Sequence, residues 1–112
     1  MIKILFVCHG NICRSPMAEF IMKKIISDKG LESQFLIESA ATSTEEIGHD
    51  MYPPAKRKLT EKEIPFSKRR ARQIRFDEYE KWDYILGMDR WNLQNLKRIF
   101  YNDNKEKVHS LL

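Results

Sequence analysis

The 112-residue chain has room for one domain, and a hydrophobic content of 42% is enough for one modest core. No run of about 20 apolar residues is present, which excludes an ordinary transmembrane helix. The net charge is +4, with much of the excess between Lys56 and Arg75, but neither an alternating aromatic–basic pattern nor a nucleic-acid module is visible. We therefore expect one domain over residues 1–112 that binds neither nucleic acid nor membrane.

The first apolar run, residues 2–7, is nearly continuous, which is typical of a central parallel strand. It begins directly after Met1 without a signal peptide, and two cysteines in one loop make no disulfide framework, so we expect a cytoplasmic protein. A helical pattern follows from about residue 15 to residue 29, with Ser15 as a favourable N-cap. Apolar residues at helical spacing predict its buried face: Met17, Phe20, Ile21 and Ile25.

The rest of the chain continues to alternate strands and helices. Short apolar runs predict strands over residues 35–39, 84–88 and 108–112. Helical patterns, the last of them capped by Asp89, predict helices over residues 55–62, 77–81 (a single turn) and 91–100. This alternation predicts a parallel sheet with helices on both faces and a ligand site at the carboxyl ends of its strands.

The loop after the first strand carries the residues with the clearest chemistry. Five residues separate the Cys8 thiol from the Arg14 guanidinium, so the loop can curl and point successive backbone N–H groups at one tetrahedral anion. The helix that begins near Ser15 adds positive potential, and Arg14 offers a planar fork of donors for two phosphate oxygens. In such an electropositive site the Cys8 thiolate is favoured and is a nucleophile aimed at phosphorus.

Residues 8–19, C-H-G-N-I-C-R-S-P-M-A-E, resemble the signature of the low-molecular-weight protein tyrosine phosphatases. Segments further along resemble the family in the same order: S-A-A-T-S at residues 39–43, A-R-Q-I at 71–74 and D-Y-I-L-G-M-D at 83–89. The resemblance implies an α/β fold of the flavodoxin-like, doubly wound type, with a four-stranded parallel sheet in the order 2-1-3-4. It also implies hydrolysis of phosphotyrosine or related small phosphomonoesters through a phosphocysteine intermediate, without a metal or other cofactor.

The resemblance assigns roles to the loop residues. The nucleophile, the phosphate clamp and a hydroxyl donor to the sulfur are Cys8, Arg14 and Ser15, and the phosphate-binding residues are His9, Gly10, Asn11, Ile12 and Cys13. Asn11 is expected to hold the loop in an unusual backbone conformation, with Ser39 as its partner, and Cys13 to form a reversible disulfide that shields Cys8. From the residues alone, either cysteine could be a packing residue and Asn11 a plain turn residue.

Three departures from the family pattern affect these expectations. Glu45, with Glu46 beside it, stands on the pocket wall where the family often has an aromatic residue, and it would repel an acidic substrate. Arg69 stands where a histidine of the loop-supporting network is usual. The chain contains no Asp-Pro dipeptide, whereas family members continue beyond the fourth strand into an Asp-Pro loop, which supplies the general acid, and a last helix.

We therefore expect a chain that is truncated, split or naturally short and that lacks the last helix. It should turn over tyrosyl phosphates poorly, because general acid catalysis is typically worth about 10²–10⁴ in rate. We also expect a homodimer, or the exchange of an element, through the uncovered face of the sheet. Asp50 and Asp89 stay open as substitute acids.

Three other functions stay open besides the phosphatase. Arsenate reductases share the loop and fold, but their chemistry resembles a relay through distal cysteines, and none follows Cys13. A phosphoarginine phosphatase is expected to have threonine at the position of Ile12. The main alternative is a phosphate-binding, catalytically impaired fragment or pseudoenzyme, with the loop intact and the acid absent.

Overall fold

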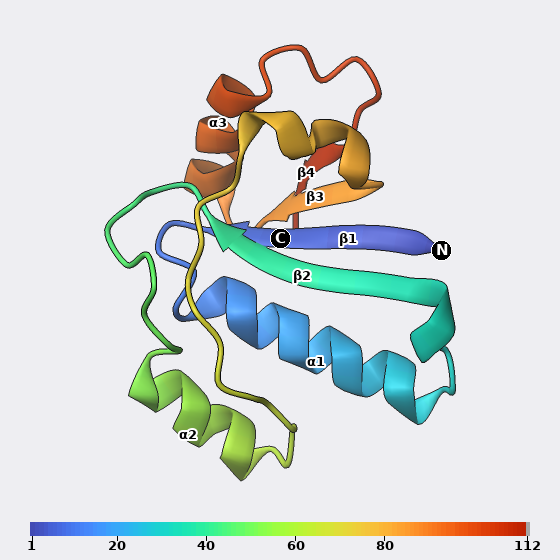
Figure 1. The fold of residues 1–112 in the computed structure, drawn as a ribbon, viewed down its shortest axis with the longest axis vertical. Coiled ribbons are helices and arrows are strands. Elements are labelled where there is room, and N and C mark those ends of the chain that lie inside the picture. Colours follow the sequence, from blue (N-terminus) through green and yellow to red (C-terminus); the bar gives the residue numbers. More distant parts are fainter. Residues whose placement is uncertain (112) are drawn as a thin grey trace.

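Four parallel strands form one sheet in the order β2-β1-β3-β4, which confirms the predicted fold class (Figure 1). The computed structural model describes residues 1–111. Its strands are β1 (Ile2–Cys8), β2 (Phe35–Ala41), β3 (Tyr84–Gly87) and β4 (Val108–Ser110). The last strand ends at Ser110, earlier than predicted, and the predicted strand residue Leu112 lies outside the described residues.

Helices lie on both sides of the sheet. They are α1 (Arg14–Asp28), α2 (Pro53–Glu61) and α3 (Arg90–Ile99), with 3₁₀ helices at Glu32–Gln34 and Phe76–Lys81. In Figure 1, α1 lies below β1 and β2, whereas α3 and the second 3₁₀ helix lie above the sheet. Both faces of β1 are therefore covered, which is why its apolar run is almost uninterrupted. No helix within residues 1–111 is long and apolar enough to cross a membrane.

Alternate residues of β1 point into two separate parts of the core. Leu5 and Val7 pack with residues of α3 and the segment before β3: Ile74, Trp82, Leu96 and Phe100. Ile4, Phe6 and Cys8 pack instead on the α1 side, with Ile26 and Ile37. The thiol of Cys8 thus lies at the carboxyl end of the central strand, on the same side of the sheet as α1.

The predicted buried face of α1 is partly wrong, because Ile21 and Ile25 are 37% and 45% exposed. The helix has two partners, and each buries its own stripe. The sheet contacts Ala18, Met22 and Ile26, whereas the cluster around α2 contacts Met17 and Phe20. Ile21 and Ile25 lie between these stripes, and a single-face pattern cannot distinguish them from buried positions.

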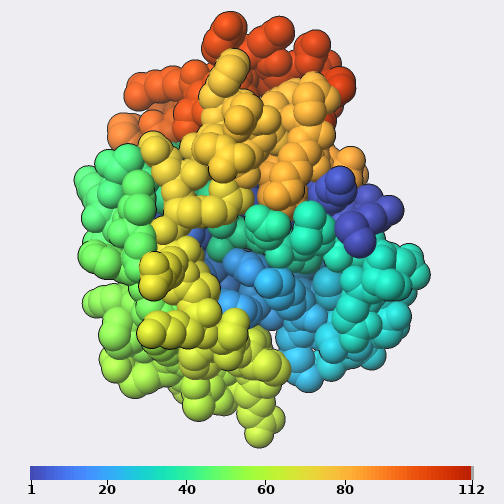
Figure 2. All heavy atoms as spheres, viewed as in Figure 1, coloured from blue at the N-terminus to red at the C-terminus, as the bar shows by residue number. Residues whose placement is uncertain are grey.

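An extended segment connects α2 to the second 3₁₀ helix and crosses the carboxyl end of β2 (Figure 1). We call it the strap (residues 62–75). Backbone hydrogen bonds join it to Ala41, whose N–H donates to the Arg72 carbonyl over 2.7 Å and whose carbonyl accepts from Ile74 over 2.8 Å. The strap lies at the surface beside the loop of residues 42–52, drawn in green in Figure 2. It therefore brings residues from the middle of the chain to the end of β1 and β2.

Candidate active site

Cys8 ends β1, and residues 9–13 curl from it to the start of α1. Its side chain is 4% exposed, and the sulfur accepts the backbone N–H of Asn11 over 3.3 Å. Within residues 1–111, the backbone N–H groups of Gly10, Ile12 and Cys13 have no protein acceptor. A loop with several unpaired N–H groups at a helix N-terminus has the features of an anion site, with the Cys8 sulfur at its base.

The expectation that Ser15 is the N-cap of the helix is wrong. α1 begins at Arg14, and Cys13 is the N-cap without a side-chain hydrogen bond. The buried Ser15 hydroxyl serves the loop instead: it accepts from Asn11 Nδ2 over 2.8 Å and lies 3.1 Å from Cys8 Sγ. Its own proton is free to point at the sulfur, which is nearer than the Ala40 carbonyl at 3.4 Å. A hydrogen bond donated in this way stabilises the thiolate.

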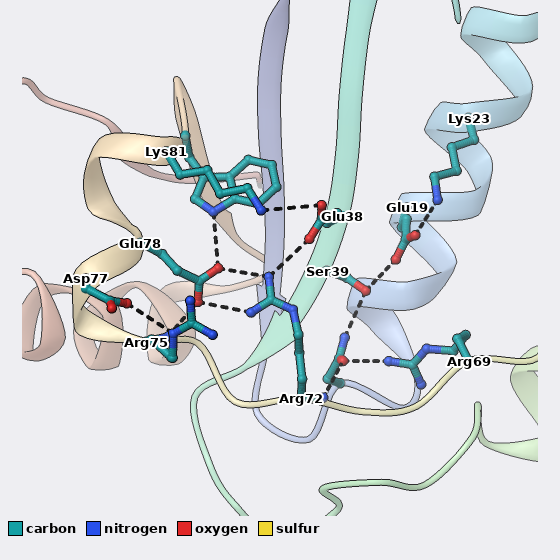
Figure 3. Close-up of polar contacts among 12 residues, drawn as sticks. Glu19, Lys23, Glu38, Ser39, Arg69, Arg72, Arg75, Asp77, Glu78 and Lys81 are labelled. Atoms are coloured by element: carbon teal, nitrogen blue, oxygen red, sulfur yellow. Dashed lines mark hydrogen bonds and ion pairs between the residues drawn. The ribbon is translucent and has the colours of Figure 1, made fainter.

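Asn11 lies at the centre of the hydrogen bonds that support the loop, between the Ser39 and Arg69 side chains labelled in Figure 3. It is fully buried with a φ of 58°, in the left-handed region that asparagine tolerates better than most residues. Its Nδ2 donates to Ser15 Oγ and, over 2.9 Å, to Ser39 Oγ. Its Oδ1 accepts from Arg69 Nη2 over 2.5 Å and from the Arg72 N–H over 3.2 Å. The structure thus places Ser39 beside Asn11, the pair that the resemblance implies.

Two outer residues complete this network: Glu19, which was not among the sequence candidates, and Arg69, which stands where the family usually has a histidine of the network. Glu19 accepts the Ser39 hydroxyl over 2.6 Å and is paired with Lys23. Arg69 comes from the strap, 58 residues after Asn11. Glu19 stands inside the signature at residues 8–19, but no local sequence pattern reveals that it accepts the hydroxyl of Ser39. The basic stretch between Lys56 and Arg75 therefore directs one of its side chains, Arg69, inward to Asn11.

Arg14 is half-exposed, and its Nη1 donates to Asp89 Oδ2 over 2.6 Å. Asp89 is itself fixed as the N-cap of α3, because it accepts the Asn92 N–H over 2.8 Å. The guanidinium is thereby held from one side at the mouth of the loop. Its other N–H groups have no acceptor among the described residues, which suits them to bind an anion seated in the loop.

Neither Asp50 nor Asp89 has a proton to donate at neutral pH. A hydrogen bond from Lys56, assisted by the N–H groups of Met51 and Arg69, lowers the pKa of Asp50 to about 2 against the opposing effect of burial. The Asn92 N–H and then Arg14 hold the pKa of Asp89 below its ordinary value. A general acid must be protonated when the leaving group departs, so both carboxyls are unsuited to that role.

Acidic side chains stand on the rim of the loop. Glu45 Oε2 lies 3.0 Å from His9 Nε2, and both side chains are about half-exposed or more. Glu46 approaches so closely that a Cβ on Gly10 would come within 3.3 Å of Glu46 Cγ, so glycine makes room for it. The mouth that leads to Cys8 is therefore bordered by carboxylates on the side of the 42–52 loop.

Cys13 and Ile12 lie on the α2 side of the loop. Burial, and then the neighbouring Cys8, raises the pKa of the Cys13 thiol, partly offset by Arg14. Cys13 is therefore a neutral thiol at pH 7. Both cysteines are free in this structure, and the disulfide between them stays a prediction. The Ile12 carbonyl accepts the Tyr52 N–H over 2.7 Å, which ties the loop to the start of α2.

Comparisons with known proteins agree with this geometry. Residues 3–112 match the family model described as low molecular weight phosphotyrosine protein phosphatase. A chicken protein of that description is 47% identical over 97 residues, which cover 85% of this chain and 60% of the relative. The crystal structure of Bacillus subtilis YfkJ has a TM-score of 0.95 and 37% identity, covering 100% of this chain and 70% of that one. A Streptococcus pyogenes low molecular weight protein tyrosine phosphatase has a TM-score of 0.90 and 39% identity, covering 98% of this chain and 71% of that one. The chain thus spans 60% of the length of the chicken relative.

Proposed function

Because the chain belongs to the low molecular weight phosphotyrosine protein phosphatase family, we propose that it hydrolyses phosphotyrosine or related small phosphomonoesters. In the first step the Cys8 thiolate attacks phosphorus, the bond from phosphorus to the ester oxygen breaks, and a phosphocysteine forms. In the second step water attacks that phosphorus and releases inorganic phosphate and the thiolate. The observation that carries the proposal is the buried Cys8 sulfur, with donors at 3.1 and 3.3 Å, at the base of a loop of unpaired N–H groups.

The other loop residues have electrostatic roles in this proposal. The backbone N–H groups of Gly10, Ile12 and Cys13 hold the phosphate oxygens, and Arg14 binds two of these oxygens as a fork. Ser15 donates to the sulfur, which stabilises the thiolate before attack and again when it leaves the phosphocysteine. These donors need no rearrangement in this proposal, because Arg14 can keep its Nη1 bond to Asp89 while its other N–H groups bind the phosphate oxygens.

Rapid-mixing kinetics with p-nitrophenyl phosphate test the proposal, because this leaving group needs little protonation. We expect a burst of p-nitrophenolate near one equivalent per chain, followed by slower turnover limited by hydrolysis of the phosphocysteine. If phosphate binds but neither burst nor turnover is seen, the chain is a binding module and the catalytic proposal is wrong.

The carboxylate of Glu45 predicts a preference for cationic substrates. We expect phosphotyrosine peptides with lysine beside the phosphotyrosine to have a higher kcat/KM than matched peptides with aspartate. In Glu45→Gln this ratio should fall about two- to fivefold, the effect of one exposed charge pair. Steady-state kinetics with the two peptides measure it.

Glu32→Gln is the matched control for Glu45→Gln. It removes the same charge from the 3₁₀ helix before β2, at the opposite end of the strands. The lysine-to-aspartate ratio should therefore equal that of the wild-type chain. An unchanged ratio in Glu45→Gln, or an equal fall in both variants, contradicts a role for Glu45 on the pocket wall.

Other expectations from the sequence stay predictions. These are the single domain over residues 1–112, the cytoplasmic location and the homodimer or exchanged element. Exposed apolar side chains on the α1 side of the molecule, Ile21, Ile25 and Tyr84, agree with self-association through that face.

A further inference from the structure

A hollow of about 260 Å³ lies beside the candidate active site, between α3 and the loop of residues 42–52. Figure 2 shows the orange residues of α3 next to the green residues of that loop. The hollow adjoins the phosphate-binding loop, because one of its lining residues is the first residue after Cys8. The lining residues are His9, Thr42, Ser43, Asn95, Arg98 and Ile99.

We propose that this hollow binds an acidic side chain of a phosphotyrosine peptide and that Arg98 selects it. The inference rests on the proposed function and adds a substrate class to it. The preferred peptide has an acidic residue on one side of phosphotyrosine, facing Arg98, and a basic residue on the other side, facing Glu45.

The size of the hollow suits one side chain. Sites for small-molecule ligands usually have volumes of about 300–1,000 Å³, and this hollow, at about 260 Å³, lies below that range. Its occupant is therefore expected to be part of a molecule that is anchored elsewhere. The neighbouring phosphate-binding loop provides the anchor, since it holds the phosphate of the same peptide.

The free donors of the hollow come from α3. Asn95 and Arg98 stand three residues apart on this helix, and side chains at that spacing are neighbours on one face. Among the residues that the structure describes, neither side chain has a hydrogen-bond or ion-pair partner. A planar guanidinium next to an amide NH₂ group can bind both oxygens of one carboxylate.

The other polar groups of the hollow leave this positive charge uncompensated. The Ser43 hydroxyl donates to the His9 carbonyl over 2.9 Å, and His9 Nε2 lies 3.0 Å from Glu45 Oε2. None of the described residues that line the hollow is acidic. His9 thus has a carboxylate on one side and the guanidinium of Arg98 on the other, so a peptide that crosses the mouth meets charges of opposite sign.

The position of Arg98 indicates which residue of the peptide reaches it. Arg98 lies about 13 Å along α3 from Asp89, the partner of Arg14, at a rise of about 1.5 Å per residue. An extended peptide advances about 3.3–3.6 Å per residue, and the long side chains of glutamate and arginine cover part of the distance. The acidic residue should therefore stand two or three positions from phosphotyrosine.

The test measures the affinity of phosphotyrosine peptides for the Cys8→Ser chain by fluorescence anisotropy, so that no peptide is hydrolysed. Each peptide has one glutamate in an alanine background, at one of the three positions before or after phosphotyrosine, and its matched partner has glutamine there. On one side only, glutamate should strengthen binding about two- to fivefold over glutamine, the effect of one exposed charge pair. The difference should shrink at high salt.

Three variants in the same background assign the effect to Arg98. In Arg98→Gln the two peptides should bind equally, and in Arg98→Glu the glutamine peptide should bind more tightly. This inversion is a gain of preference, which a chain that has merely lost stability would not show. Lys97→Gln is the matched control, because Lys97 stands in the same last turn of α3 but does not line the hollow. It should keep the preference for glutamate.

Three outcomes overturn the inference: no preference for glutamate at any position, a preference unchanged in Arg98→Gln, or an equal loss in Lys97→Gln. If no peptide binds at all, the anion site of the loop is refuted and this inference with it. The measurement needs no turnover. A failed kinetic burst together with a glutamate preference that depends on Arg98 would therefore reject the phosphatase proposal alone.

Discussion

Replacement of Cys8 by serine is expected to lower kcat for p-nitrophenyl phosphate at least about 10⁵-fold and to abolish the burst. The serine hydroxyl is not ionised at neutral pH, whereas the Cys8 sulfur has the Asn11 N–H and the Ser15 hydroxyl within 3.3 Å to stabilise a thiolate. Among the described residues the other thiol of the loop is Cys13, and burial raises its pKa, which makes it a weaker nucleophile at neutral pH. Single-turnover and steady-state kinetics measure both quantities.

Binding of inorganic phosphate is the control for this variant. The N–H groups of the loop and Arg14 are unchanged in Cys8→Ser, so calorimetry should find phosphate affinity within about tenfold of the wild-type chain. Retained affinity with lost turnover assigns the defect to chemistry and not to folding. Turnover close to the wild-type rate would mean that another group attacks phosphorus and would refute the proposed intermediate.

The second large effect is expected on stability. Arg72→Met should lower the free energy of unfolding by about 3–5 kcal/mol at pH 7, the usual cost of leaving a buried charge without its partner. Arg72 grips Glu78 with two nitrogens, at 2.9 and 3.0 Å, and Glu78 is 4% exposed (Figure 3). The backbone of Arg72 also supports Asn11, so the variant tests the attachment of the strap to the loop. Urea denaturation measures the change.

The pH dependence gives this prediction a second test. Burial alone raises the pKa of Glu78, but hydrogen bonds from Arg72, the Arg75 N–H and Trp82 hold it below its ordinary value. A carboxyl with a lowered folded pKa stabilises the fold fully above its unfolded pKa of about 4.3, and that stability is lost as the pH falls through the folded value. The difference between wild type and Arg72→Met should therefore be largest near pH 7 and shrink below about pH 4.

Arg75→Met is the matched control for Arg72→Met. Arg75 pairs with Asp77, and both side chains are at least 70% exposed, so its loss should destabilise the fold far less than the loss of Arg72. Equal destabilisation in the two variants would show that the buried pair between Arg72 and Glu78 is not what secures the strap.

The predictions from the sequence were accurate where the interactions are local or periodic. The uninterrupted apolar run of β1 follows from burial on two faces, and the spacing between Cys8 and Arg14 follows from a loop that closes on itself within a few residues. Element positions were therefore close to those found, and the sheet order followed from the resemblance. The same reasoning misjudged Ile21 and Ile25, because a periodic pattern does not state how many partners a helix has.

By itself, then, the sequence determined the order of the elements, the nucleophile candidate and the loop that surrounds it. Only the tertiary structure decided which distant groups direct that loop. Arg69 and Arg72 meet Asn11 across about 60 residues of chain, and Asp50 loses its suitability as an acid through the contacts it makes with Lys56 and the strap. The physical reason is that a hydrogen bond or a pKa depends on distances in space, which residue spacing encodes only within one turn or one strand.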